Sequence, residues 1–206
     1  MSTKGIVFVV DDDVRIRESL QSLLVAADYD VRLYGDVESF LAESLPNVPC
    51  CIILDLNLGS VSGLEVQRRL SRDAASAVIF LTGCADIPST VRAMKAGALD
   101  FLTKPVEEDE LLLAVNNALY RATLRWERRK AEREIRRSYM TLTPRERDVL
   151  PFVVQGFLNK QTAYELGTSE ITIRIHRGNI MRKMRADSLA HLVRLAGKLG
   201  IPQPQI

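Results

Sequence analysis

Short β-branched, apolar runs alternate with segments of helical periodicity through the front half of the sequence, and this alternation limits the fold more than any other feature. A strand followed by a helix and a second strand forms a βαβ unit, and repeated units build a parallel sheet that helices cover on both faces. The predicted strands span residues 6–10, 31–34, 52–54, 78–81 and 101–102. The predicted helices span residues 14–27, 37–45, 64–72, 87–96 and a segment from Glu107 onward. We therefore expect an α/β fold with a doubly wound, five-stranded parallel sheet.

Polar side chains follow most of these strands at the point where each strand ends. They are Asp11, Asp12 and Asp13, then Asp55 and Asn57, then Thr82, and last Lys104. Because parallel strands end at one edge of their sheet, we expect these groups to meet there. Clustered carboxylates raise one another's pKa unless a cation neutralises them, so Asp11, Asp12 and Asp55 indicate a hard divalent ion such as Mg²⁺. Asp55 is then equipped to attack a phosphoryl group, with a hydroxyl and an ammonium group nearby.

Each of these residues also has an ordinary structural interpretation. A single aspartate after a strand is usually a helix cap, and Asp13 is expected to cap the helix that starts at Val14. Thr82 alone would be an ordinary strand residue, and Lys104 alone a solvated one. Only their conjunction at one edge of the sheet favours a functional site.

Charge is distributed unevenly along the chain. Residues 1–120 carry 10 Lys+Arg against 18 Asp+Glu, a net charge of −8, whereas residues 121–206 carry 18 against 8, a net charge of +10. This asymmetry indicates two modules, of which the second is suited to a polyanion. No apolar run approaches the roughly 20 residues that cross a bilayer, and no signal peptide is evident, so we expect a cytoplasmic protein. The three cysteines, Cys50, Cys51 and Cys84, lack metal-site spacing and are expected to be reduced core residues.

The segment between the modules favours a long helix. Residues 107–142 contain neither glycine nor proline, and the apolar face that begins at Leu111 thins out after Ala122. The basic run at residues 125–137 is interpreted first as a solvated helix face and second as a DNA contact. A short coiled coil through Leu124 and Ile135 is a weaker alternative, because the apolar stripe is broken. The predicted division is a first domain at 1–120, a helical linker at 121–140 and a second domain at 141–206.

The second domain has the signals of a small all-α, four-helix unit. Thr143, Pro144 and Glu146 form the N-terminal signature of a helix with a capping box. A short helix at 160–166, a turn at Gly167 and a helix from Ser169 to residue 184 describe a helix-turn-helix, and a final helix spans 188–199. Pro151 lies inside the first of these helices and is expected to kink or shorten it.

The strand-end residues resemble the receiver domain of two-component response regulators, whose fold is flavodoxin-like. The resemblance rests on Asp11-Asp12, Asp55, Thr82, Lys104-Pro105 and the sequence AMKAGA at residues 93–98. It implies that Asp12, Asp55 and the Asn57 carbonyl bind Mg²⁺, while Asp11 holds a water on the metal. It also implies that Asp55 accepts a phosphoryl group from a sensor histidine kinase, that Thr82 and Lys104 contact that group, and that Phe101 changes rotamer. The bond before Pro105 is expected to be cis, and Gly59 departs from the proline usual at its position.

The second domain resembles the LuxR-type DNA-binding domain of NarL/FixJ regulators, nearest the FixJ-like branch. The resemblance rests on LTPRERDVL at 142–150, NKQTA at 159–163 and TIRIHRGNI at 172–180. It implies that the helix after Ser169 enters the major groove of double-stranded DNA, with Arg174, Ile175 and Gly178 facing the bases. Phosphate contacts or helix-packing groups are expected at Lys160, Thr172, Arg177, Asn179 and Lys183. His176 is interpreted as a hydrogen-bonded structural residue ahead of a phosphate contact.

We expect a transcription regulator rather than an enzyme. Phosphorylation of Asp55 is expected to control homodimer formation and DNA binding, and RNA polymerase is a further candidate partner. A phosphohydrolase of the haloacid dehalogenase type also uses a strand-end aspartate and Mg²⁺, but it needs a second acid where this chain has Asn57. A receiver with an RNA-binding antiterminator tail is disfavoured by the helix-turn-helix signals.

Overall fold

The structure, a computed structural model, describes residues 4–43, 45–59, 61–70, 75–83 and 87–201. The chain divides into two compact units, Met1–Glu127 and Arg128–Ile206. The boundary falls inside one helix, and each unit is described by itself. The predicted three-part division into 1–120, 121–140 and 141–206 stays a prediction.

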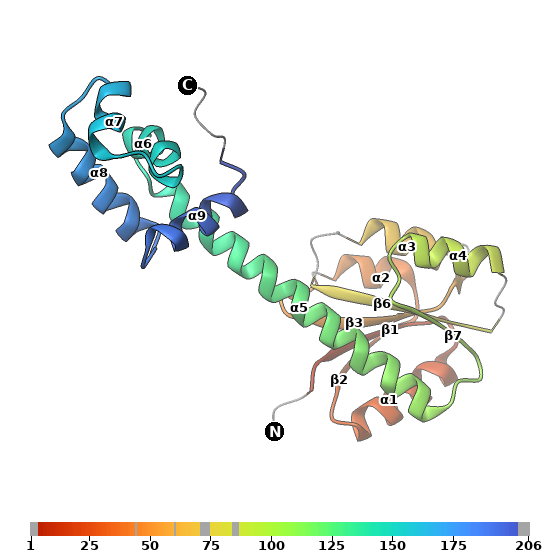
Figure 1. The fold of residues 1–206 in the computed structure, drawn as a ribbon. Helices are drawn as coiled ribbons and strands as arrows, with labels where there is room; N and C mark the ends of the chain where they lie inside the picture. Colours follow the sequence, from red (N-terminus) through yellow and green to blue (C-terminus); the bar gives the residue numbers. More distant parts are fainter. Residues whose placement is uncertain (1–3, 44, 60, 71–74, 84–86, 202–206) are drawn as a thin grey trace. The chain divides into compact units, whose positions relative to one another are not determined.

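The first unit is built on the predicted five-stranded sheet (Figure 1). Its strands are β1 (Ile6–Val10), β2 (Asp30–Tyr34), β3 (Cys50–Leu54), β6 (Ser76–Thr82) and β7 (Asp100–Thr103). They are parallel and lie in the order β2-β1-β3-β6-β7. This order reverses between β1 and β3, and ligands bind doubly wound sheets at such a point, outside the carboxyl ends of the strands. The strands extend by one to two residues beyond most predicted bounds, because pairing with neighbours continues past the most apolar residues.

Helices cover both faces of the sheet, as predicted (Figure 1). They are α1 (Val14–Ala26), α2 (Val37–Ala42), α3 (Gly63–Arg69), α4 (Ile87–Lys95) and α5 (Glu108–Met140). One core lies between the sheet and α1 with the start of α5, and the other between the sheet and α2, α3 and α4. Helix α2 ends at Ala42, before the predicted residue 45, because Glu43 is extended and accepts hydrogen bonds from Arg32 and Tyr34. Helix α3 ends at Arg69, and the rest of its predicted span, residues 71–72, lies outside the described residues.

Two short strands that sequence analysis missed follow the central strand. They are β4 (Asn57–Leu58) and β5 (Val61–Ser62), which pair antiparallel. Gly59 has a positive φ of 60° in the turn between them, a conformation that glycine adopts at low cost. Gly63 follows the second strand and donates its N–H to the Leu56 carbonyl. A Cβ atom at Gly63 would lie 2.3 Å from the Asp55 carbonyl oxygen.

Two buried thiols and one indole hydrogen bond lie near the start of β3. Cys50 and Cys51 are buried, free thiols at the start of β3, whereas Cys84 lies outside the described residues. Trp126 of α5 donates its indole N–H to the Asn47 carbonyl, 2.7 Å away, in the loop before β3. Because Trp126 is the single tryptophan, its fluorescence reports on this unit.

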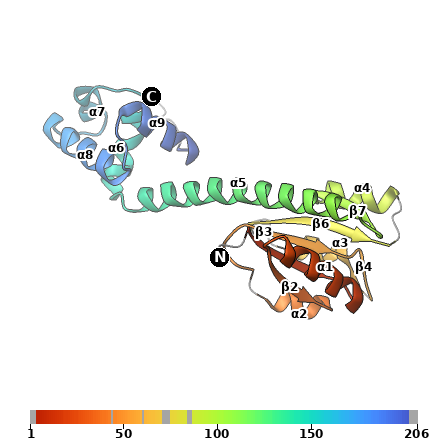
Figure 2. The ribbon, with the colours of Figure 1, turned by 90° about the horizontal axis from the view of Figure 1, so that it is seen from below.

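The second unit contains the end of α5 and four further helices (Figure 2). They are α6 (Pro144–Val154), α7 (Asn159–Glu165), α8 (Glu170–Lys183) and α9 (Leu189–Lys198). Their apolar core includes Leu150, Ile173 and Ile180. Ile135 and Tyr139 of α5 pack against this core. The capping box of Thr143 and Glu146 is present, as predicted.

Two further details concern the first two of these helices. Helix α6 continues past Pro151 to Val154, so the proline does not shorten it. The N-cap of α7 is Leu158, and its backbone N–H donates to the Gln161 side chain at 2.8 Å. Within the described residues, no helix is both long and apolar enough to cross a membrane.

The tight fit at Gly63 gives a testable prediction. We expect Gly63→Ala to lower the free energy of unfolding of the first unit by about 1–3 kcal/mol, because the added methyl group overlaps the backbone of Asp55. Urea denaturation followed by Trp126 fluorescence measures this. Gly83→Ala is the matched control, because a Cβ at Gly83 meets no atom within 4 Å. Equal stabilities of the two variants would contradict the steric explanation.

Candidate functional site

Three carboxylates meet at the edge of the sheet where the strand order reverses. Val10 pairs with Leu54 in the sheet, so the residues that follow, Asp11 and Asp55, lie side by side. Asp12 is next to them in the loop, and one oxygen from each of the three carboxylates lies within 4.8 Å of the others. Asp11 and Asp55 are buried, with 2% and 8% exposure, whereas Asp12 is exposed. The structure thus brings together the acids that the sequence predicted.

Lys104 joins the two buried acids. Its ammonium Nζ donates to Asp11 Oδ2 at 2.5 Å and to Asp55 Oδ2 at 2.8 Å. Its backbone N–H donates to the Thr82 carbonyl, and its peptide bond to Pro105 is cis, as expected. Burial raises the pKa of Asp11 above its ordinary value, and this effect exceeds the opposite influence of Lys104. The pKa of Lys104 is raised as well, because its hydrogen bonds to the two acids outweigh the burial that would lower it.

The loops that carry the acids are held by their own backbone. Asp11 Oδ1 accepts the N–H of Asp13, and Asp55 Oδ1 accepts the N–H of Asn57. Asp13 also caps α1, as predicted, by accepting the N–H of Arg15. Each acid is therefore oriented by a local turn as well as by Lys104.

Arg17 is a supporting residue that sequence analysis missed. Its guanidinium donates to the Asp11 carbonyl at 2.6 Å and lies against Gly35, where a Cβ would be 3.2 Å from it. An arginine in the first helix has no distinguishing spacing, and the neighbouring glycine is far away in sequence. Only the folded structure shows that Arg17 fixes the turn after β1.

The acids line an open hollow that suits a hard cation. Its volume is about 370 Å³, and it is lined by Asp11, Asp12, Asp13, Ile16, Asp55, Asn57, Gly83 and Lys104. Carboxylate oxygens and backbone carbonyls are the ligands that Mg²⁺ takes in proteins, usually together with several waters. Since the hollow offers carboxylates at close range and open space for water, the residues present fit Mg²⁺.

Thr82 and Phe101 lie behind the hollow on neighbouring strands. Thr82 is fully buried at the end of β6 and pairs with Thr103 of β7. Phe101 is half-buried and its ring centroid is 6.2 Å from that of Phe80. Nearby, α4 exposes an apolar stripe in which Ile87 is 79% exposed and Val91 and Met94 are each 44% exposed.

In the second unit, α8 presents an exposed face with the composition expected of a DNA reader. Arg174, Ile175 and Gly178 are all exposed, and they fall on one side of the helix by their spacing. A Cβ at Gly178 would meet nothing within 4 Å, so backbone or DNA can approach closely there. Lys160 of α7 is also exposed.

Several other predicted DNA contacts make bonds inside the unit. Lys183 Nζ donates to the buried carboxylate of Glu146 at 2.7 Å. Arg177 donates to the Phe157 carbonyl at 3.3 Å, the hydroxyl of Thr172 lies 2.8 Å from that of Ser169, and Asn179 accepts a hydrogen bond from Arg182. For Lys183 and Arg177, these contacts favour the packing role that sequence analysis had left open.

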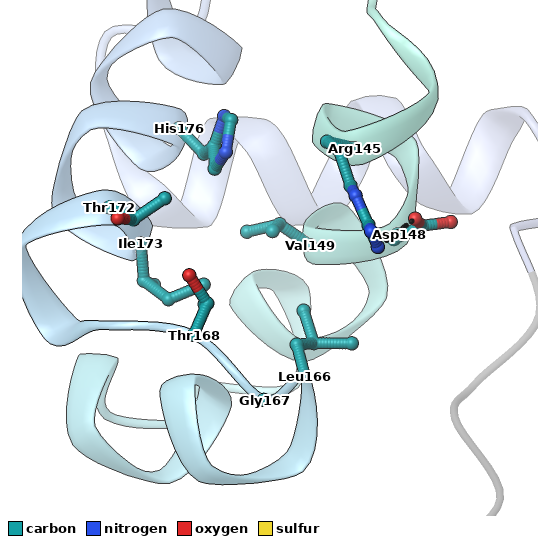
Figure 3. A pocket seen from close by; sticks show the side chains of 9 residues that line it. All are labelled: Arg145, Asp148, Val149, Leu166, Gly167, Thr168, Thr172, Ile173 and His176. Carbon is teal, nitrogen blue, oxygen red and sulfur yellow. Dashed lines mark ion pairs between the residues drawn. The ribbon is translucent and has the colours of Figure 1, made fainter.

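A second hollow, of about 170 Å³, lies between helices α6 and α8 (Figure 3). The turn at residues 166–168, which precedes α8, also lines it. Figure 3 shows His176 and Thr172 on one side of it and Arg145 on the other. The Nδ1 atom of His176 is buried without a hydrogen-bond partner in the described part of the chain, so the hydrogen bond expected for this residue is not found at that atom. Arg145 and Asp148 form an exposed ion pair at its rim, 3.6 Å apart.

Similarity to known proteins decides the family. Residues 7–116 match the family described as response regulator receiver domain, and residues 140–196 match the one described as bacterial regulatory proteins, luxR family. The chain belongs to the NarL/FixJ family of response regulators. The first unit is its receiver, and the second contains its LuxR-type DNA-binding domain.

Relatives and solved structures agree with this assignment over nearly the full length. Nodulation protein W of Bradyrhizobium diazoefficiens is 46% identical over 201 residues, which are 97% of this chain and 88% of that protein. The transcriptional regulatory protein FixJ of the same organism is 37% identical over 98% of both chains. The solved structure of the response regulator StyR is 41% identical and matches 95% of this chain and 100% of its own, with a TM-score of 0.87.

The buried pair in the DNA-binding domain predicts a pH-dependent stability. Burial would raise the pKa of Glu146, but hydrogen bonds from Lys183 and the Thr143 N–H hold it below its ordinary value. The stabilisation is therefore complete above the ordinary pKa of a glutamate and is lost as the pH falls through the lowered value. We expect Glu146→Gln to cost about 2–4 kcal/mol at pH 7. Denaturation followed by circular dichroism at several pH values should show this difference shrinking in acid, and a difference independent of pH would contradict it.

Salt dependence separates base, phosphate and packing roles among the basic residues of α8. Arg174→Ala should cost about 1–3 kcal/mol on the preferred DNA site and relax preference at one position per half-site. Lys183→Gln should weaken binding to all sequences, because it unpairs Glu146, yet leave the slope of affinity against salt unchanged. Titrations of duplex DNA at several salt concentrations measure both. If Lys183→Gln lowers the slope by about one, Lys183 contacts a phosphate instead.

Proposed function

We propose that Asp55 accepts a phosphoryl group from a sensor histidine kinase and that this modification controls homodimer formation and sequence-specific binding to double-stranded DNA. The observation that carries the proposal is the joint hold of Lys104 on Asp11 and Asp55 at the reversal point of the sheet. Carboxylates that were exposed and lacked a cationic partner would need no function, because water alone would stabilise their charge. A half-buried lysine between two acids gives the site a cation positioned beside the acceptor oxygen.

The proposed reaction needs few groups. A carboxylate oxygen of Asp55 attacks the phosphorus of a phosphohistidine, the P–N bond breaks, and the imidazole of the kinase leaves with the electron pair. Asp55 becomes an acyl phosphate. Lys104 and the hydroxyl of Thr82 would contact the oxygens of the transferred group. Mg²⁺, held by Asp12, Asp55 and the Asn57 carbonyl and by Asp11 through a water, would neutralise charge on the phosphoryl oxygens.

The response would pass to the surface near α4. Thr82 moves toward the phosphoryl group in this proposal, and Phe101 then fills the space that the threonine leaves. We expect a second receiver to contact this surface of α4. The exposed apolar stripe of Ile87, Val91 and Met94 supports this, because an apolar patch favours association.

The output proposed is DNA binding rather than turnover of a substrate. The family is one of transcription regulators. Arg174, Ile175 and Gly178 would face base edges in the major groove, with a dimer reading two half-sites. Lys160, Thr172 and Asn179 would lie near phosphates. The proposal also divides the chain into a receiver (1–120), a linker (121–140) and a DNA-binding domain (141–206). It further includes a cytoplasmic location and contact with RNA polymerase.

Labelling tests the phosphoacceptor. Incubation with a small phosphodonor such as acetyl phosphate and Mg²⁺ should label the chain stoichiometrically, Asp55→Ala should abolish the label, and Asp12→Ala should weaken it through loss of metal. Asp36→Asn is the control, because asparagine preserves the helix cap that Asp36 provides away from the site. Stoichiometric labelling of Asp55→Ala, measured by intact mass, would sink the assignment.

DNA titration tests control. Fragments selected from genomic DNA should bind the phosphorylated chain more tightly than the unmodified chain at matched salt and concentration, because paired domains gain avidity. If the phosphorylated and unmodified chains bind the same DNA site with equal affinity, phosphorylation does not control DNA binding.

A further inference from the structure

Helix α8 turns one continuous face toward solvent. At about 100° per residue, five exposed residues fall within a single arc of the helix, which we name the outer face. They are Ile171, Arg174, Ile175, Gly178 and Arg182. On the opposite side, Ile173, Ile180 and Met184 are buried in the core of the second unit. If α8 enters a groove of DNA, the outer face is therefore the side that meets the base pairs.

The side of α8 next to the outer face is already occupied by the domain itself. Thr172, Ile173 and His176 line the hollow between α8 and α6 (Figure 3). These residues are directed to the inside of the unit and leave the outer face without a neighbour from α6.

Two isoleucines are the unusual members of the outer face. The exposed fraction is 64% for Ile171 and 58% for Ile175. A β-branched side chain favours a helix less than alanine does, and an exposed one gains no packing in return. A single exposed apolar residue is ordinary, but residues four positions apart on a helix are neighbours and form one apolar surface. The pair thus favours a binding role over a structural one.

Positive charge surrounds this apolar surface. Helix α8 contains four Lys or Arg residues and one Glu, a net charge of +3. Arg174 and Arg182 lie on the outer face, whereas Glu170 precedes it. Gly178 has no side chain, and a Cβ there would meet no atom within 4 Å. The outer face is suited to a polyanion that carries small apolar groups, and the C5-methyl groups of thymine in the major groove are such groups.

We propose that Ile171 and Ile175 recognise thymine through contact with its C5-methyl group, which makes Ile171 a further specificity-determining residue. The inference rests on the proposed function, in which α8 lies in the major groove. The family resemblance implies base contacts for Arg174, Ile175 and Gly178, and the exposure of Ile171 on the same face adds a fourth position. The two isoleucines are about 6 Å apart along the helix axis. Since base pairs are stacked about 3.4 Å apart, each isoleucine would contact a different base pair.

A protein partner is the competing occupant of this face. An apolar pair would also suit a polymerase subunit or a second copy of this chain. DNA is favoured because the pair lies between arginines on a helix with a net charge of +3, and because a helix about 10–12 Å wide fits a major groove about 12 Å wide.

Thymine replacement in the DNA tests the inference. The duplex is a site selected from genomic fragments by the phosphorylated full chain. Each thymine of the half-sites is replaced in turn by deoxyuridine, which keeps every base-pair hydrogen bond and lacks the methyl group. The chains compared are the wild type, Ile171→Ala and Ile175→Ala, with Val193→Ala as the matched control because Val193 is an exposed aliphatic residue of α9. Alanine favours helix, so circular dichroism should show all four chains folded.

We expect the wild type to lose about fourfold in affinity for each methyl group removed at two thymines of a half-site. On the thymine duplex, Ile171→Ala should lose about fourfold per half-site, and deoxyuridine at one of the two positions should then cost it nothing more. Ile175→Ala should show the same behaviour at the other position. Val193→Ala should match the wild type throughout. The slope of affinity against salt should be equal for all chains, because no charge is removed.

Four results would overturn the inference. They are a selected half-site without thymine, a wild type that is indifferent to every deoxyuridine, deoxyuridine losses that persist in both isoleucine variants, and isoleucine variants that bind every duplex as the wild type does. The third would mean that the methyl groups act through DNA shape. The fourth would assign the outer face to a protein partner. If the wild-type chain binds the selected duplex and a random duplex equally, or binds neither, the proposed function fails, and this is measured on thymine duplexes alone.

Discussion

The ammonium group of Lys104 is the contact on which the receiver site depends. Two buried carboxylates on neighbouring strands would repel one another, and each would resist ionisation inside the protein. Lys104 reaches both from a third strand end, so the sheet must hold β1, β3 and β7 in register for the site to exist. The turn at Arg17 and the close fit at Gly63 both support the backbone beside the two acids. Fold and site are in this sense one arrangement.

Sequence analysis predicted the strands, the acids and the lysine because each carries a local signal. Strands buried on both faces read as short apolar runs, and their ends are marked by polar residues. The contacts of Arg17, Glu43 and Lys183 carry no such signal. Each of these residues binds a partner whose separation along the chain matches neither the helix period nor the strand period. Glu146 shows both cases: its capping box was visible within four residues, whereas its bond to Lys183 depends on how α6 and α8 pack. The short β4–β5 pair was missed since two-residue strands have no period to detect.

Helix α5 contributes to two separate cores. Leu111 and Val115 pack in the receiver, and Ile135 and Tyr139 pack in the DNA-binding unit. Between them the helix has few apolar residues and many charges, so propensity and ion pairs must maintain it there. Substitutions among these charged residues would remove no side chain from either core.

Strand β3 is chemically asymmetric along its length. Its carboxyl end presents Asp55 to an open hollow, while its amino end carries Cys50 and Cys51 in the interior. Burial raises the pKa of Cys50 to about 11 and raises that of Cys51 still further, so both thiols stay protonated, and the protonated form reacts poorly with oxidants. Oxidants that modify exposed thiols would therefore leave Cys50 and Cys51 unmodified. The central strand of the receiver is insulated from redox chemistry at one end and open to phosphoryl chemistry at the other.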